Sequence, residues 1–226
     1  GAITVPGIVF MRGGAVAVLV ILECEGKEYT VLVNQARVPI GTHSLPEIPA
    51  GMLDGSGHFK GVAAEEIAEE CNMVISEAEL VDLTELAYGE QFRGIIPSSG
   101  GCDEFLRAFV FRRAVEPAVL SALQGRLAGV FEEGEYIKLQ IIPLADLWRT
   151  TPDAKALSAL ALFDSLRANG DLPMEVQRTN DTVTGVAELM VEHAPSAEAG
   201  GDADEDLQTV VEVCMPHQAG FGRLPP

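Results

Sequence analysis

The apolar positions of this chain fall into short strand-like runs around two helical segments. Residues 15–23 and 29–35 are rich in Val and Leu, and the polar, glycine-bearing stretch CEGKE between them predicts a β-hairpin. In residues 62–73 apolar side chains recur at helical spacing while glutamates take another face, which predicts a helix after a glycine-rich loop. The pattern also predicts strands at 79–89, 104–115 and 136–148, and a helix at 153–170 with Asp153 near its start and Gly170 after its end.

Strands on both sides of a central helix, followed by a late helix, indicate a mixed α+β sandwich. A length of 226 residues favours one domain with an appendage. We place the domain at residues 1–172. Residues 173–226 are predicted to be a largely flexible appendage, because PSAEAGGDADEDLQ is acidic and rich in small residues. The flanking stretches VTGVAELMVEH and LQTVVEVCM are apolar enough to form short elements or to dock.

The net charge disfavours some classes of binding partner. With 15 Lys and Arg against 34 Asp and Glu, the net charge is -19, and its field repels nucleic acid and anionic membranes. No apolar run reaches the roughly 18 residues of a membrane span, and we expect a soluble protein. The four cysteines lie far apart without a C-x-x-C pair, which favours reduced thiols over zinc ligands or disulfides. We expect a cytoplasmic protein, or an organellar one if a leader was removed before Gly1.

The segment EEIAEEC, residues 65–71, gathers four glutamates on a predicted helix. Glu66 is three residues before Glu69 and four before Glu70, so the carboxylates converge, and like charges at this spacing destabilise a helix by roughly a few tenths of a kcal/mol per pair. A bound Mg²⁺, which prefers oxygen ligands, would turn this repulsion into coordination. The alternative is a solvated acidic face. Gly51, upstream of the helix, favours the metal site because its backbone can approach the helix closely.

The segment GMLDGSGHFKGVAAEEIAEECNM, residues 51–73, resembles the Nudix box, a motif of one glycine followed at fixed spacing by glutamates, an arginine and a second glycine. The positions that match are Gly51, Glu66, Ile67, Glu69, Glu70 and Met73. Three positions depart from the motif: Gly57 replaces its first glutamate, Glu65 replaces its arginine, and Asn72 replaces its late glycine. The glutamates that bind metal in the family are therefore retained. The motif's first glutamate and its arginine, which support the loop and helix in the family, are both lost.

The resemblance extends over roughly residues 5–172, through GGAVAVLVIL, QARVP, EIPAGMLD, SSGGCDE and DAKALSALALF, which look like the ADP-sugar diphosphatase branch of the Nudix hydrolases. It implies a Nudix fold, which is an α/β/α sandwich with a mixed β-sheet and an amino-terminal antiparallel hairpin. It also implies a homodimer formed through the amino-terminal strands. The implied reaction is Mg²⁺-dependent hydrolysis of the pyrophosphate bond of ADP-ribose or ADP-glucose to AMP and a sugar phosphate. Mn²⁺ is the alternative ion.

The resemblance also assigns roles at the metal site. Glu66 and Glu70 match the main metal ligands, and Glu69 matches a further ligand or an orienting group with a catalytic role. The carbonyl of Ala50, just before the box glycine, matches a backbone ligand. GVFEEGEYIKL resembles a loop that carries a catalytic glutamate, with Glu133 and Glu135 at the matching places. One would serve as general base and the other as an outer metal ligand, and we favour Glu133 as the base. An acidic turn before a strand is the alternative.

On the substrate side, Arg37 in QARVP matches an arginine that grips phosphate oxygens, with a structural salt bridge as the alternative. Ser99, Gly100 and Gly101 match a loop in which the family has proline at the place of Ser99. Glu104 follows this loop and is either near the substrate or on the surface. We therefore predict a nucleotide-sugar substrate without identifying which one.

Two other functions fit parts of the sequence. A catalytically weak nucleotide-sugar sensor would explain Gly57 and Glu65, but the retained Glu66, Glu69 and Glu70 favour an enzyme. A structural interaction module led by the acidic tail explains neither the glutamate helix nor SSGGCDE, and we rank it last.

Overall fold

The predicted hairpin forms the middle of a β-sheet in the computed structural model, which describes residues 7–53, 57–130, 135–173 and 184–190. Strand β1 (Gly14–Cys24) pairs antiparallel with β2 (Lys27–Arg37). The turn between them has positive φ at both Glu25 and Gly26, 50° and 75°, as in the tight hairpin turns that match the twist of paired strands. The hairpin prediction is confirmed.

The sheet is mixed, as the sequence predicted. Its described strands run in the order β5-β6-β1-β2-β8-β7, with β3 paired to β2 and β4 paired to β1. β1 and β6 are parallel, whereas the other pairs of named strands are antiparallel. The remaining strands are β3 (Thr42–Glu47), β4 (Ala50–Met52), β5 (Val81–Asp82), β6 (Phe105–Ala114), β7 (Leu127–Ala128) and β8 (Ile137–Pro143).

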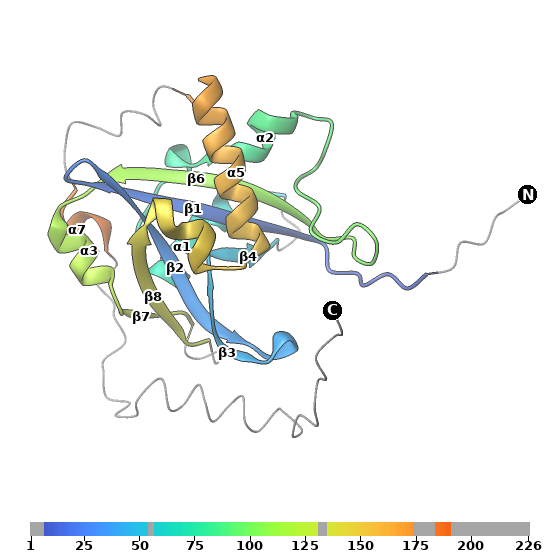
Figure 1. Ribbon diagram of the computed structural model, residues 1–226, viewed down its shortest axis with the longest axis horizontal. Coiled ribbons are helices and arrows are strands. Elements are labelled where there is room, and N and C mark those ends of the chain that lie inside the picture. The colour runs from blue at the N-terminus through green and yellow to red at the C-terminus, as the bar shows by residue number, and fades with distance from the viewer. Residues whose placement is uncertain (1–6, 54–56, 131–134, 174–183, 191–226) are drawn as a thin grey trace, which may run out of the picture.

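Helices cover both faces of this sheet (Figure 1). Alternate side chains of a strand point to opposite faces, and β1 is buried along almost its whole length. Val16, Val18 and Val20 pack in the layer of α1, α3 and α7, while Leu19 and Ile21 pack in the layer of α2 and α5. The predicted α/β/α sandwich is confirmed. The described helices are α1 (Phe59–Cys71), α2 (Leu83–Tyr88), α3 (Pro117–Leu123), α4 (Leu147–Thr150), α5 (Ala154–Asn169) and α7 (Val186–Leu189).

Both predicted helices are present. Helix α1 begins at Phe59, three residues before the predicted start, and ends at Cys71. Helix α5 follows the prediction closely: the Asp153 carboxylate caps its first turn by accepting hydrogen bonds from the backbone N–H groups of Lys155 and Ala156, and Gly170 ends it at a φ of 77°.

Two strand predictions were too long. Within residues 79–89 only Val81 and Asp82 form a strand, β5. Residues 83–88 form α2, because the Asp82 carboxylate accepts a 2.8 Å hydrogen bond from the backbone N–H of Glu85 and starts a helix. Residues 136–148 form β8 only as far as Pro143, after which Leu144–Asp146 form a 3₁₀ helix that leads into α4. Proline cannot donate to a sheet ladder, so the strand ends there.

Three of the four cysteines lie among the described residues. Cys24, Cys71 and Cys102 are free of disulfides, and Cys214 lies outside the described residues. Burial, with the charge of Glu70 adding to it, raises the pKa of the Cys71 thiol, which therefore stays protonated. Across the described parts of the chain, the helices are too short or too polar to cross a membrane.

A short stretch beyond the predicted domain boundary docks on the sandwich. Thr184 forms a parallel bridge with Val115, and Met190 forms an antiparallel bridge with Met73, just after the end of α1. The backbone N–H of Val74 donates a 2.8 Å hydrogen bond to the carbonyl of Leu189, whose side chain is fully buried in the α1 layer. The apolar stretch VTGVAELMVEH therefore contributes core residues, as its composition suggested.

We expect Leu189→Ala to lower the free energy of unfolding by about 2–5 kcal/mol, the usual cost of emptying a buried leucine site. Val74→Ala is a matched control, because Val74 lies beside the same bridge but is 55% exposed, and it should cost about 0.5 kcal/mol or less. Equilibrium denaturation of both variants provides the measurement. Equal, small losses would show that residues 184–190 do not stabilise the fold.

Candidate metal and substrate site

The glutamates of α1 lie at different depths. Glu70 is 2% exposed, Glu66 is half-buried, and Glu65 and Glu69 are exposed. The helix therefore does not present one uniformly solvated acidic face, since its two deepest carboxylates point into the protein. A buried carboxylate is costly unless it is hydrogen-bonded, neutralised or bound to a cation. The solvated-face alternative fails for Glu70.

Strand β4 supplies the surface against which these carboxylates dock. The backbone N–H of Ala50 donates a 2.9 Å hydrogen bond to Glu70 Oε2, and Gln35 Nε2 donates a 3.4 Å bond to Oε1. At Gly51 the backbone approaches Glu66 so closely that an added Cβ would lie 1.5 Å from Oε1. Any side chain at position 51 would displace the Glu66 carboxylate. The close approach predicted for this glycine is therefore present.

Burial and mutual repulsion raise the pKa values of both inner glutamates. Burial is the main cause of the rise for Glu70, to about 8, and the charges of Glu66 and Glu135 add to it, while the Ala50 N–H and Arg37 oppose it. Burial also raises the pKa of Glu66, to about 7, with contributions from Glu69, Glu135 and Glu65. A divalent cation would favour the charged forms of both groups.

Glu66 and Glu70 form an acidic cluster, and Glu135 approaches it from the connection between β7 and β8. The backbone N–H of Gly129 donates a 3.0 Å hydrogen bond to the Glu69 carbonyl, which ties this connection to α1. Glu135 then folds back on the connection, since its N–H bonds to the Val130 carbonyl at 3.2 Å. The charge of Glu135 raises the pKa of both Glu66 and Glu70. Glu133, the other candidate in this loop, lies outside the described residues.

The donor chemistry of this cluster fits a hard cation better than a soft one. Carboxylate oxygens are the ligands that Mg²⁺ prefers, and the described cluster contains no cysteine or histidine ligand. Among the described residues, no three His, Cys, Asp or Glu side chains are already gathered closely enough to hold an ion. Each Glu70 oxygen accepts one hydrogen bond, and an ionised carboxylate oxygen keeps a further lone pair that can bind a cation.

The predicted substrate residues form two groups. Arg37 forms an ion pair with Glu47 and also opposes the rise in the Glu70 pKa, so it belongs to the surroundings of the acidic cluster. The loop with Ser99, Gly100, Gly101 and Glu104 instead packs on the amino-terminal segment: Gly101 accepts a 2.8 Å backbone bond from Phe10, and Glu104 pairs with Arg12 at 2.9 Å.

The departures from the motif have local explanations. Asn72 ends α1 in the left-handed region, at φ 54° and ψ 37°, where glycine is favoured and asparagine is the best tolerated alternative. Its side-chain amide also donates a 3.2 Å bond to the Leu127 carbonyl, which links α1 to β7. Gly57, at a φ of 73°, sits in the turn before α1, and Glu65 faces solvent. Gln35, Glu47 and Lys155 were not among the predicted site residues, because their roles depend on contacts between separate segments of the chain.

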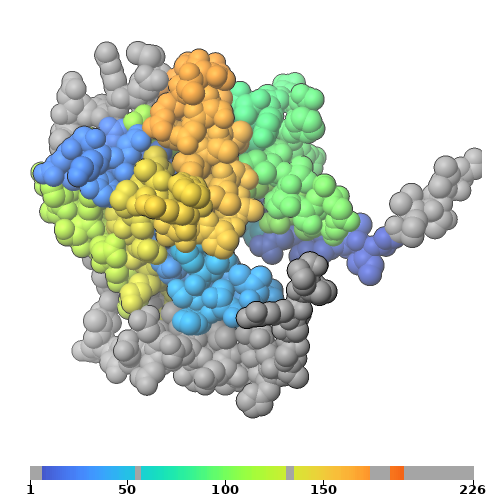
Figure 2. All heavy atoms as spheres, viewed as in Figure 1, coloured from blue at the N-terminus to red at the C-terminus, as the bar shows by residue number. Residues whose placement is uncertain are grey.

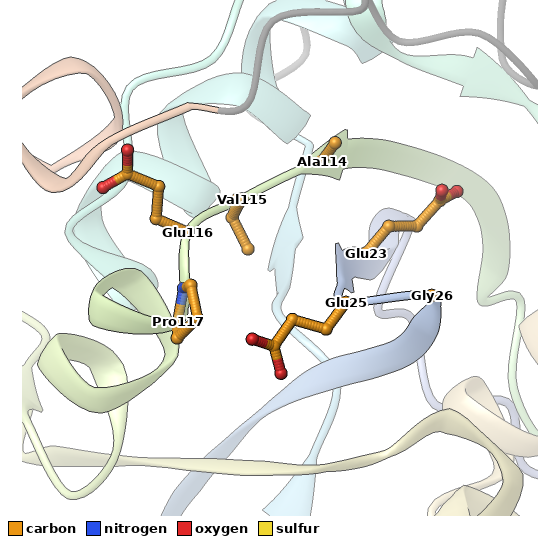
Figure 3. A pocket seen from close by; sticks show the side chains of 7 residues that line it. All are labelled: Glu23, Glu25, Gly26, Ala114, Val115, Glu116 and Pro117. Atoms are coloured by element: carbon orange, nitrogen blue, oxygen red, sulfur yellow. The ribbon is translucent and has the colours of Figure 1, made fainter.

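A separate hollow lies at the other end of β1, at the hairpin turn (Figure 3). It is lined by Glu23, Glu25, Gly26, Ala114, Val115, Glu116 and Pro117. None of these residues was predicted to take part in chemistry. The acidic cluster faces β4, which pairs with the first residues of β1, so the hollow and the cluster are distinct places on the sheet.

The architecture and site together define an α+β protein with a glutamate helix docked on a β-strand. No family model matches the chain. A curated relative, Nudix hydrolase 14, chloroplastic, from Arabidopsis thaliana, is 46% identical over 167 residues, which cover 74% of this chain and 54% of the relative. The chain thus spans about half the length of this relative. This similarity supports the Nudix hydrolase family for the chain.

Two solved structures are also similar, each at 15% sequence identity. The crystal structure of an ADP compounds hydrolase aligns with 70% of this chain and 76% of its own, with a TM-score of 0.47. A binary complex of a C. elegans Ap4A hydrolase aligns with 69% of this chain and 98% of its own, with a TM-score of 0.46.

The raised pKa values predict how stability depends on pH without metal. An unfolded glutamate releases its proton near pH 4.5, whereas Glu66 and Glu70 hold theirs to about 7 and about 8. Between these limits the folded state binds more protons, so the free energy of unfolding should fall as pH rises from about 4.5 to about 8. In Glu70→Gln this decrease should be smaller, because an amide does not titrate.

Denaturant unfolding in EDTA at several pH values would test this prediction. Glu116→Gln is the control, since Glu116 lines the distant hollow and should leave the pH dependence unchanged. A Glu70→Gln variant with the same pH dependence as the parent would contradict the prediction.

Proposed function

We propose that this chain is a Mg²⁺-dependent hydrolase of ADP-sugars, which cleaves the pyrophosphate bond of ADP-ribose or ADP-glucose to give AMP and a sugar phosphate. The observation that carries the proposal is the burial of the Glu70 and Glu66 carboxylates against Ala50 and Gly51. Without a cation, these acids repel each other in a poorly solvated site. Similarity to the Arabidopsis Nudix hydrolase supports the same conclusion.

In this proposal Glu66, Glu70 and the Ala50 carbonyl would hold the ion, and Glu69 would be a further ligand or would orient one. The ion, when bound, neutralises the phosphate charge that repels an incoming nucleophile. A glutamate of the loop after β7, Glu133 or Glu135, accepts a proton from the attacking water. The oxygen of this water bonds to one phosphorus, the P–O–P bridge breaks, and the bridging oxygen leaves with the other phosphate.

Arg37 is the cation that this proposal assigns to the substrate phosphates, because it lies beside Glu70 and retains 39% of its side-chain exposure. Ser99, Gly100, Gly101 and Glu104 are proposed to contact the remainder of the nucleotide sugar. Their packing on the segment of Phe10 and Arg12 supports one continuous loop surface rather than isolated contacts.

We also propose a homodimer, which is supported by the apolar run Ile8–Met11, whose side chains are 61–91% exposed. The name of the Arabidopsis relative places that protein in the chloroplast. Similarity to a chloroplast protein favours an organellar location for this chain over a cytoplasmic one.

Glu70→Gln should lower Mg²⁺-dependent AMP release by at least about 100-fold, because removing even an outer partner of a metal site commonly costs 10- to 100-fold. The assay compares ADP-ribose, ADP-glucose and UDP-glucose with and without Mg²⁺. Glu116→Gln, at the distant hollow, should retain the parent rate. If the parent binds these compounds without turnover, the chain is instead a nucleotide-sugar sensor.

The two loop glutamates should separate by their kinetic effects. Glu133→Gln should lower kcat by about 100-fold or more with little change in the Mg²⁺ concentration required, as expected for loss of a general base. Glu135→Gln should raise the Mg²⁺ concentration for half-maximal rate, because Glu135 acts on Glu66 and Glu70. The measurement is the rate of AMP release as a function of Mg²⁺ concentration for both variants. The reverse pattern would make Glu135 the general base and Glu133 the outer metal ligand.

A further inference from the structure

A buried carboxylate at the end of β3 is paired with two cations from different elements. Glu47 is 3% exposed, and it contacts Arg37 of β2 and Lys155 of α5, each at 2.5 Å. Burial alone would raise the pKa of Glu47, but Arg37 and Lys155 outweigh it and hold this pKa below its usual range. Glu47 is therefore ionised, and its charge is compensated by side chains rather than by solvent.

The geometry of this pair orients the guanidinium of Arg37. Nε donates to Oε1 at 2.5 Å and Nη2 donates to Oε2 at 3.2 Å, a side-on, bidentate arrangement. Such pairing uses one edge of the planar fork and fixes its plane, which leaves Nη1 on another edge. Among the described residues, Nη1 of Arg37 has no hydrogen-bond partner. The side chain is 39% exposed, so this edge is open to a ligand.

Lys155 occupies a position where a lysine is electrostatically unfavourable. It is the second residue of α5, and the amino-terminal end of a helix carries partial positive charge. Its Nζ compensates by pairing with Glu47 at 2.5 Å and with the helix-capping Asp153 at 3.0 Å. Thr151 adds a hydrogen bond to the Pro46 carbonyl, so the start of α5 is fixed to β3. Figure 2 shows β3 in blue directly below the lower end of α5.

The orientation of Arg37 matters because the acidic cluster of Glu66 and Glu70 lies nearby. Burial lowers the pKa of Arg37, but Glu47, Glu70 and Asp153 raise it above its usual value, so Arg37 has several carboxylates within electrostatic reach. A mobile arginine here would pair with Glu70 and compete with a bound cation. Bidentate pairing with Glu47 holds the guanidinium away from that carboxylate.

We propose that Glu47 and Lys155 are positioning residues, which hold Arg37 side-on so that its open edge binds a phosphate of a nucleoside diphosphate. This inference rests on the proposed function and deepens it, since it names the residues that prepare the phosphate contact. Lys155 acts through Glu47, and Glu47 acts through Arg37. The unit joins the neighbouring strands β2 and β3 to α5, which lies more than 100 residues later in the chain.

The experiment measures ADP binding by calorimetry in the presence of Mg²⁺, together with the melting temperature of each variant. Glu47→Gln keeps the size of the side chain but removes bidentate pairing, and it should weaken ADP binding about tenfold. Lys155→Met should weaken binding in the same direction, and Lys155→Arg should restore it. Arg149→Met is the matched control, because Arg149 forms an exposed pair with Asp146 near the start of α5 and should leave ADP binding unchanged.

A double-mutant cycle separates positioning from simple support of the fold. If Glu47 acts through Arg37, then Glu47→Gln should have little further effect on ADP binding in an Arg37→Met background. Equal losses in both backgrounds would overturn the inference. So would a lowered melting temperature with unchanged ADP binding, or a parent chain that does not bind ADP. A parent that binds ADP but hydrolyses no ADP-sugar would refute the proposed function while leaving this inference intact.

Discussion

The hydrogen bond between the Ala50 N–H and the Glu70 carboxylate is the contact on which the site depends. It fixes a helix glutamate to the backbone of β4, which in turn pairs with the first residues of β1. The helix therefore takes its depth and rotation from the sheet. Once Glu70 is fixed, Glu66 falls against Gly51, where only a hydrogen atom fits. The buried Glu70 carboxyl group is then tolerated either in its protonated, neutral form or as the ligand of a cation.

Few positive side chains are available in a chain with a net charge of -19, and their placement is specific. Arg37 and Lys155 converge on one buried glutamate, while Arg107 pairs with Asp82 and Glu85 at α2 and stacks on Phe59 at the start of α1. Ion pairs thus connect the sheet to α2 and α5 on one face, and the stacking of Arg107 on Phe59 reaches α1 on the other. The glutamates of α1 have no lysine or arginine three or four residues away on their own helix, which leaves their compensation to Arg37, backbone donors and a cation.

The carboxyl-terminal end of α1 is fixed by contacts from later segments. At its end, Asn72 adopts the left-handed conformation and bonds to Leu127, and Met73 pairs with Met190. The glycine of the motif is replaced by the residue that best tolerates the same backbone angles. Residues 184–190 thereby belong to the support of the glutamate helix, although a composition-based boundary placed them in an appendage.

The sequence alone determined the hairpin, the glutamate helix, α5 with its Asp153 cap and Gly170 end, and the sandwich, because periodicity and capping are local signals. It also predicted a close backbone approach at Gly51, and in the structure Gly51 lies directly against Glu66. Local pattern failed at residues 83–88, where apolar residues fit a strand or a helix and the Asp82 cap decided between them. Only the tertiary structure decided that Glu70 is buried while Glu69 is exposed, and that Lys155 reaches Glu47 across 108 residues of chain. Such contacts depend on how separate elements pack together, and no spacing along the chain encodes them.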